Sequence, residues 1–309
     1  MHNPFTIGSM IQNSAEFVGR TAELQFLLTR LRSLQSCSVV GERRIGKSSL
    51  LYHLHQTGAA RLSEELGEAG FRFVYVELAD AAAQTVVDFL RTVLDAVQCP
   101  TDGIKDDNKP SRNLTAFDQA IKARAEAGER LVLCLDEFEA LFENPAEFNN
   151  AFFNHLRTMV NHRRLALVTA SRQPLEIYSL EKRLTSPFFN VLSITALGDF
   201  TEAEALQFLA LHHPHVNFTE DELRFINSWL DPHPLKLQIL CDQVLQNRQR
   251  LNWQNDMVKI DEVEKVCRQF LGEKGVKKNW YQFKGKITLD SISKTLANLK
   301  TGRDLLTGK

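Results

Sequence analysis

Gly41-Glu42-Arg43-Arg44-Ile45-Gly46-Lys47-Ser48 is a complete G-x-x-x-x-G-K-S phosphate loop. The apolar run 37–40 before it predicts a buried strand, and the run that begins at Ser49 predicts a helix with an apolar face. In this setting the N–H groups of the loop point at phosphate oxygens, aided by the positive end of the helix dipole. We therefore expect Lys47 to reach the β- and γ-phosphates and Ser48 to bind Mg²⁺. The alternative is a strand-to-helix turn that binds no ligand.

A second signal lies about ninety residues further along the chain, where five apolar residues, 131–135, precede Asp136 and Glu137. This run predicts a strand buried on both faces, as in a parallel sheet. Ligands bind at the carboxyl ends of the strands in such sheets, so we expect Asp136 to hold the magnesium shell and Glu137 to polarise the attacking water. Solvated acids at a strand end are the alternative. Together with the phosphate loop, the pair predicts a nucleoside triphosphatase.

Composition bounds the class of protein. The chain has 309 residues, 43% of them hydrophobic, and a net charge of −1, which excludes a polycation. It contains no run of 18 or more apolar residues and does not begin with a signal-peptide pattern, so we expect no membrane association. The five cysteines are widely spaced and odd in number, which predicts reduced thiols in a cytoplasmic protein.

Strand and helix patterns alternate through the first two thirds of the chain. Strands are expected at 37–41, 71–78, 131–136, 165–170 and 191–196, and helices near 47–57, 84–97, 114–127 and 147–161. This alternation predicts an α/β fold with a parallel sheet and helices on both faces. After Gly198 the segments 201–212, 219–230, 234–249 and 260–271 all have helical patterns. We therefore expect three regions, namely an α/β domain over 1–198, a small helical lid over 199–271 and a basic segment over 272–309.

Several motifs resemble those of AAA+ and STAND ATPases. Asn3-Pro4-Phe5 and Phe17-Val18-Gly19-Arg20 resemble their N-terminal adenine box, and the Arg43-Arg44-Ile45 filling of the phosphate loop is similar to that of prokaryotic STAND ATPases. The run 167–174 is similar to their sensor 1 strand, and Asp231-Pro232-His233-Pro234 stands where the lid carries its Gly-x-Pro motif. The resemblance covers roughly residues 3 to 245. It implies an ASCE-type P-loop NTPase fold, with ATP or ADP and Mg²⁺ as ligands.

The resemblance also implies roles for individual residues. Phe17 and Val18 would flank the adenine ring while Gly19 lets the backbone approach; the alternative is a hydrophobic staple at a helix start. Arg20 would reach the nucleotide, or else pair with Glu23 on the surface. The expected nucleotide-binding residues are Gly41, Glu42, Arg43, Arg44, Ile45, Gly46, Lys47, Ser48, Ser49, Phe17, Val18, Gly19, Arg20, Thr169, Ser171, His233 and Pro234. The expected metal ligands are Ser48 and Asp136, and the expected catalytic residues are Glu137, Lys47, Asp136 and Arg172.

Five of these residues come from the sensor strand and the lid. The polar ends of Thr169, Ser171 and Arg172 would lie beside the γ-phosphate, with a simple strand terminus as the alternative. His233 and Pro234 would approach the base from the lid, although Pro234 is also a favourable first residue for the helix that follows.

Two polar clusters have alternative interpretations. His212-His213-Pro214-His215 has the composition of a metal site, but no Cys or paired helical His accompanies it, so we expect a solvated loop at a helix end. From Leu271 to Lys309 there are nine Lys or Arg against three Asp or Glu, with Trp280, Tyr281 and Phe283 among them. Such a segment either binds nucleic acid through phosphate contacts and stacking or is a winged-helix remnant or solvated tail, and we expect the second.

These patterns predict an ATPase that acts as a STAND-type molecular switch, with slow or partner-controlled hydrolysis. The resemblance implies oligomers in the ATP state, a separate effector or sensor protein, and a setting in bacterial antiviral defence. A DNA-associated AAA+ ATPase, similar to origin-recognition loaders or transposition regulators, is the alternative. A nucleotide-binding scaffold without turnover is a third possibility, against which the presence of Glu137 argues.

Overall fold

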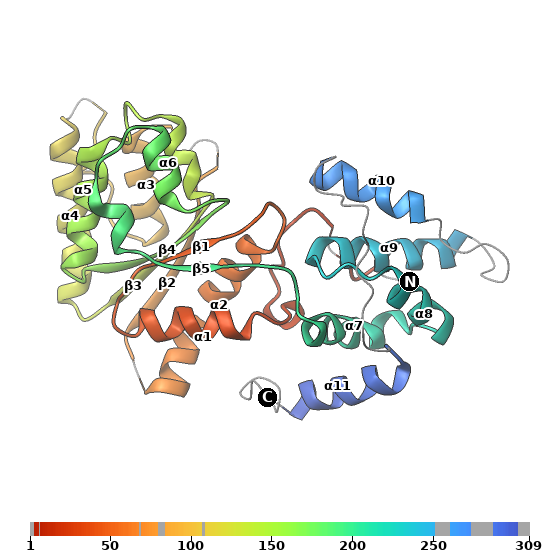
Figure 1. Ribbon diagram of the computed structural model, residues 1–309. Coiled ribbons are helices and arrows are strands. Elements are labelled where there is room, and N and C mark those ends of the chain that lie inside the picture. The colour runs from red at the N-terminus through yellow and green to blue at the C-terminus, as the bar shows by residue number, and fades with distance from the viewer. Residues whose placement is uncertain are drawn as a thin grey trace.

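The computed structural model contains a sheet of five parallel strands flanked by helices (Figure 1). The structure describes residues 3–5, 7–67, 69–79, 84–106, 109–250, 260–272 and 287–301. The order across the sheet is β2-β3-β4-β1-β5. The strands are β1 (Cys37–Val40), β2 (Phe71–Glu77), β3 (Arg130–Asp136), β4 (Leu165–Ser171) and β5 (Ser193–Ala196). The predicted α/β fold is confirmed.

Strand register brings the functional strand ends together. β4 lies between β1 and β3, with Val40 opposite Ser171 and Leu135 opposite Thr169. Every residue of β4 is buried, as expected for a central strand of a parallel sheet. The carboxyl ends of β1, β3 and β4 therefore meet at one edge of the sheet, where the phosphate loop, the two acids and the sensor residues follow.

Two apolar layers cover the two faces of the sheet, because successive strand residues point to opposite sides. On β3, Leu133 and Leu135 pack with α3 (Val86–Ala96), α4 (Pro110–Glu126) and α5 (Asn150–Asn161). Val132 and Cys134 face the other layer, formed with α1 (Thr21–Leu31) and α2 (Lys47–Leu66). The first layer is rich in phenylalanine. Phe148, just before α5, and Phe152, Leu156 and Met159 of α5 are all buried in it.

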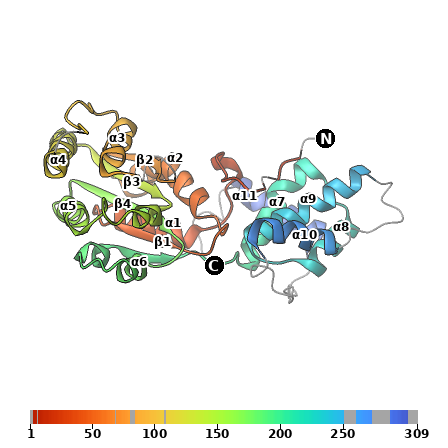
Figure 2. The same ribbon diagram turned by 90° about the horizontal axis from the view of Figure 1, so that it is seen from above.

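The chain after β5 is helical, as predicted. Figures 1 and 2 show it as a second lobe beside the α/β lobe. It contains α7 (Glu202–Val216), α8 (Glu220–Trp229), α9 (Pro234–Arg250), α10 (Ile260–Leu271) and α11 (Leu289–Thr301). Capping boxes begin two of these helices, Thr201 with Glu204 and Thr219 with Glu222. No helix in the described parts of the chain is long and apolar enough to cross a membrane.

The histidine cluster was predicted wrongly as a solvated loop. α7 continues to Val216, with Pro214 inside it, and His212 is buried. The His212 ring stacks on Phe5 at 5.1 Å between centroids, and its Nδ1 lies 2.8 Å from the carbonyl oxygen of Phe208. An N-terminal residue far away in sequence therefore covers this polar side chain. Among the described residues no group of three His, Cys, Asp or Glu could hold a metal ion.

The predicted helix ranges did not include α1, α6 (Leu175–Glu181), α11 or the 3-10 helix η3 (Phe138–Glu143). The short η1 (Ser14–Glu16) and η4 (Pro187–Val191) are 3-10 turns. Trp280, Tyr281 and Phe283, with most of the lysines of the basic segment, lie outside the described residues.

Candidate nucleotide-binding site

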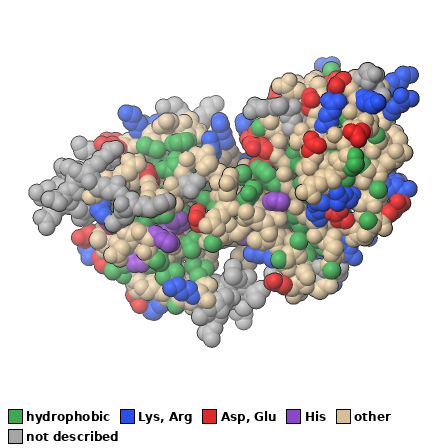
Figure 3. All heavy atoms as spheres, turned by 180° about the vertical axis from the view of Figure 1, so that it is seen from behind, with side chains coloured by type: hydrophobic (Ala, Val, Ile, Leu, Met, Phe, Trp, Pro, Cys, Tyr) green, Lys and Arg blue, Asp and Glu red, His purple; other side chains and the backbone are tan. Residues whose placement is uncertain are grey.

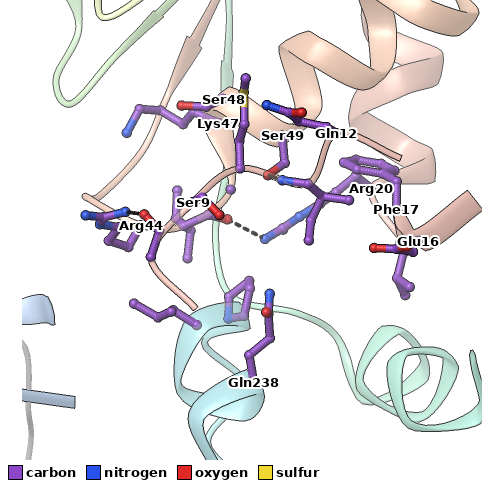
Figure 4. A pocket seen from close by; sticks show the side chains of 18 of the residues that line it. Ser9, Gln12, Glu16, Phe17, Arg20, Arg44, Lys47, Ser48, Ser49 and Gln238 are labelled. Carbon is purple, nitrogen blue, oxygen red and sulfur yellow. Dashed lines mark hydrogen bonds between the residues drawn. The ribbon is translucent and has the colours of Figure 1, made fainter. Parts of the chain in front are cut away.

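A cavity of about 430 Å³ lies at the carboxyl edge of the sheet and extends to the helical lobe (Figure 4). Its walls come from the N-terminal segment, the phosphate loop, the ends of β2 and β3, and the helices α7 and α9. The cavity is therefore built from both lobes. Ligand pockets in proteins are often found at such interfaces between domains.

The phosphate loop needs glycine at both ends: the first glycine has no room for a side chain, and the second has a positive φ. A Cβ atom on Gly41 would lie 2.7 Å from the carbonyl oxygen of Leu197. Gly46 has a φ of 101° and directly precedes α2, whose first residue is Lys47. The N–H groups of the first turn of α2 thus face the cavity side, the arrangement that binds anions. Residues 43–49 all line the cavity.

Lys47 is held against the loop that it follows. Its Nζ donates hydrogen bonds to the carbonyl oxygens of Gly41 (2.8 Å) and Glu42 (3.0 Å). Burial lowers the pKa of the Lys47 ammonium, and the carboxylates of Glu139 and Asp136 act against that shift. The loop carbonyls and these acids therefore keep a cation at the position where phosphates would bind.

Asp136 is buried at the end of β3 and both of its oxygens accept hydrogen bonds. The Tyr75 hydroxyl of β2 donates to Oδ2 over 2.8 Å, and the backbone N–H of Glu137 donates to Oδ1 over 3.0 Å. Glu137 is exposed and has a φ of 51°. The backbone thus turns sharply after the strand and presents the second acid to the cavity, which both acids line.

Glu139 and Tyr75 are site residues that sequence reasoning missed. Glu139 lines the cavity and lies 3.5 Å from Nε of Arg172. Burial raises the pKa of the Glu139 carboxyl, and in the described part of the chain its Oε2 has no hydrogen-bond partner. The short run Asp136-Glu137-Phe138-Glu139 contains the acid, but only the turn at η3 shows that it faces Lys47. Tyr75 has no sequence signal, because its role depends on the pairing of β2 with β3.

The donor set fits a magnesium ion. Ser48 and Asp136 both line the cavity and supply one hydroxyl and one carboxylate. Mg²⁺ is commonly held by one or two such oxygen ligands together with phosphate oxygens and water. A magnesium site of this kind therefore does not require a cluster of three protein ligands.

The N-terminal segment crosses the cavity. Phe17 stacks on His53 of α2, with ring centroids 4.2 Å apart and planes within 12°, and Phe17 and Val18 both line the cavity. The backbone N–H of Ile11 donates to Oγ of Ser49 over 3.0 Å. Gly19 is not a lining residue among the described ones, but it has a φ of 70°, and a Cβ there would collide with the Glu204 carboxylate.

Arg20 is buried, which differs from the surface ion pair considered for it. Its Nη1 lies 3.6 Å from the Glu23 carboxylate, while its Nη2 donates to the carbonyl oxygen of Ile45. The guanidinium also stacks on Phe200 at 4.8 Å. Burial lowers the pKa of Arg20, and the charges of Glu204 and Glu23 oppose that shift. Arg20 lines the cavity and joins the phosphate loop to the helical lobe.

The sensor and lid residues divide into two groups. Arg172 and Pro234 line the cavity, and so do Leu235 and Gln238 of α9. Thr169 and Ser171 are fully buried, and the Ser171 hydroxyl donates to the Gln173 carbonyl oxygen. His233 is buried and its Nδ1 accepts the N–H of Leu235, so that it caps the start of α9. Of the expected binding residues in the described chain, those that do not line the cavity are Gly19, Gly41, Glu42, Thr169, Ser171 and His233.

Comparison with known proteins shows a similarity to one family of domains. Residues 16–168, just under half of the chain, match the AAA ATPase domain family. No curated protein sequence matches the chain significantly. Residues 16–168 are therefore similar to AAA ATPase domains, in agreement with the strand order and the phosphate loop.

Solved structures with a similar fold include the following three. The Aeropyrum pernix ORC2 protein in ADPNP–ADP complexes is 15% identical over 86% of this chain and 70% of its own, with a TM-score of 0.56. The ORC1 protein of the same organism in complex with DNA is 15% identical over 82% of this chain and 65% of its own, with a TM-score of 0.55. A Walker-type ATPase of Pyrococcus abyssi is 16% identical over 95% of this chain and 92% of its own, with a TM-score of 0.55.

Proposed function

We propose that the protein binds ATP with Mg²⁺ in this cavity and hydrolyses it to ADP and phosphate. The observation that carries the proposal is the juxtaposition of Lys47, Asp136 and Glu137 at one cavity wall. A cation, a carboxylate for the metal shell and a second carboxylate for the water are the groups that phosphoryl transfer to water requires.

Each group has a separate task in this proposal. Lys47 exchanges its hydrogen bonds to the loop carbonyls for the β- and γ-phosphate oxygens. Ser48 and Asp136 hold Mg²⁺, which neutralises phosphate charge. Glu137 orients the attacking water and accepts its proton, and Arg172 balances charge that develops on the γ-phosphate. Phe17 offers an aromatic face to the adenine, with His53 stacked behind it.

The nucleotide would also act as a switch, because the cavity has walls from both lobes. A ligand that contacts Arg20 and Gln238 together favours one relative position of the two lobes over others. On this proposal the ATP state assembles into oligomers that engage a separate effector or sensor, as in STAND ATPases, and antiviral defence is the setting that the motifs suggest.

A direct test combines turnover with sizing. Phosphate release from ATP is measured, and the protein is sized by light scattering with ATP, ADP or no nucleotide. The proposal expects slow hydrolysis and a larger species with ATP. Absence of ATP binding would refute the site, whereas binding and turnover without any change in size would refute only the switch.

DNA-associated activity is a second candidate, supported by the similarity to an ORC1 protein whose structure was determined with DNA. The net charge of +6 after Leu271 is consistent with it. Against it, basic and acidic side chains are interspersed on the face seen in Figure 3, so the described surface there has no continuous basic stripe. If DNA is bound, affinity should fall with salt at a log–log slope of about −4 to −5. Replacing Lys277, Lys278, Lys284 and Lys286, all outside the described residues, with Gln should flatten that slope.

A further inference from the structure

Tyr75 connects three parts of the site through one hydroxyl group. It lies on β2, where the register places it opposite Cys134 of β3. Its hydroxyl donates to Oδ2 of Asp136 over 2.8 Å, and the sulfur of Met10 lies 3.7 Å from the Tyr75 hydroxyl oxygen. The ring packs edge-on against Tyr52 of α2, at 5.4 Å between centroids. Both Tyr75 and Met10 line the cavity.

We propose that Tyr75 is a positioning residue for the magnesium ion, acting through Asp136; this inference rests on the proposed ATPase function. The Asp136 carboxylate is buried and has one bond to each oxygen, from Tyr75 and from the Glu137 N–H. Two fixed donors set the rotation of the carboxylate plane. Each carboxylate oxygen can accept a second bond, so acceptor capacity remains for a metal-bound water or the metal itself.

Loss of the hydroxyl would leave Oδ2 without its neutral donor inside a buried site. The carboxylate could then rotate about its Cβ–Cγ bond or draw a nearby cation toward itself, and Lys47 is close enough to interact electrostatically with Asp136. Groups that orient a metal ligand in this way typically account for a factor of about 10–100 in metal affinity or activity. The hydroxyl therefore matters for the metal, whereas the ring matters for packing.

The experiment separates the metal from the nucleotide. Calorimetry measures the affinity for a non-hydrolysable ATP analogue in EDTA and over a Mg²⁺ series, with wild type and Tyr75→Phe. The Phe variant keeps the ring and its contact with Tyr52. We expect the analogue affinity in EDTA to stay within about twofold of wild type, because the phosphate loop is untouched. The Mg²⁺ concentration for half-maximal effect should rise by about 10- to 100-fold.

A control variant makes the test specific. Tyr52→Phe removes the hydroxyl of the neighbouring tyrosine, which does not line the cavity, and should keep the wild-type Mg²⁺ dependence. An unchanged Mg²⁺ dependence in Tyr75→Phe would overturn the inference while the ATPase proposal stands. An equal loss of affinity with and without Mg²⁺ would also overturn it, since Tyr75 would then have only a structural role. Failure of the wild type to bind the analogue at all would refute the ATPase proposal itself.

Discussion

Arg20 donates a hydrogen bond from Nη2 to the carbonyl oxygen of Ile45, over 3.1 Å, inside the phosphate loop. The backbone N–H of Arg20 also donates to Oε1 of Glu204 over 2.5 Å, and Glu204 belongs to the capping box that begins α7. One residue of the N-terminal segment thus touches both the loop that would hold phosphates and the first helix of the helical lobe. This linkage gives the proposed switch a physical basis.

Arg20→Lys should weaken ATP binding by about tenfold or more. Lysine keeps the charge but loses the planar stacking on Phe200 and the geometry of the bond to Ile45, and hydrogen bonds from charged groups are worth about 1.5–3 kcal/mol. Titration with a fluorescent ATP analogue measures the effect. Arg30→Lys is a matched control, because Arg30 stacks on Phe26 at the surface of α1. Equal affinities in the two variants would show that the Arg20 linkage does not support the loop.

Lys47→Ala should lower ATP affinity by at least about a hundredfold, since Lys47 is the cation that the loop holds at the expected phosphate position. Calorimetric titration with ATP·Mg²⁺ checks this expectation. Lys122→Ala, on the exposed side of α4, removes a lysine that pairs with Glu126 and should bind as wild type does. Micromolar affinity in the Lys47 variant would place the nucleotide elsewhere.

Glu137→Gln should bind ATP·Mg²⁺ normally and lose turnover by a factor on the order of 10²–10⁴, because an amide cannot accept the proton of the attacking water. Single-turnover hydrolysis and equilibrium binding measure the two effects separately.

Glu139→Gln provides the comparison for that variant. Glu139 pairs with Arg172 and interacts electrostatically with Lys47, so loss of its charge should free both cations to bind the phosphates and should tighten ATP binding several-fold. Turnover should fall less than in Glu137→Gln. If Glu139→Gln abolishes hydrolysis and Glu137→Gln does not, the general base is Glu139.

His53 should make the fold sensitive to mild acid. Burial lowers its pKa from 6.5 to about 4, with the charge of Arg61 contributing. The unfolded chain therefore binds more protons between these values. The contribution of neutral His53 to the free energy of unfolding is complete above pH 6.5. It is lost as the pH falls toward 4, which lowers the free energy of unfolding by up to about 3 kcal/mol.

Replacing the ring removes this titration. His53→Phe should flatten the fall in the free energy of unfolding between pH 6.5 and 4.5, measured by urea denaturation at several pH values, while His162→Phe at the exposed end of α5 should not. The aromatic side chain at position 53 keeps a partner for Phe17. Parallel pH profiles for wild type and His53→Phe would contradict the assignment.

The chemistry of contiguous motifs could be predicted from the sequence. Residues 41–48 adopt a phosphate loop because glycine at its ends and a helix after it are local requirements, and Asp136 follows a run so apolar that only a buried strand suits it. Alternating strands and helices then determined the parallel sheet and the helical part after it. These inferences need only neighbours in the chain.

Only the tertiary structure decided which segments far apart in sequence are in contact. Tyr75 reaches Asp136 across 61 positions because β2 and β3 pair in one register, and a shift by one residue would turn it to the other face of the sheet. His212 was read as solvated, yet Phe5 covers it. Arg20 supports Ile45 only because the N-terminal segment folds back over the loop. Side-chain burial depends on how helices and strands pack together. The local sequence therefore cannot show that a polar residue is buried when its contacts come from a distant segment of the chain.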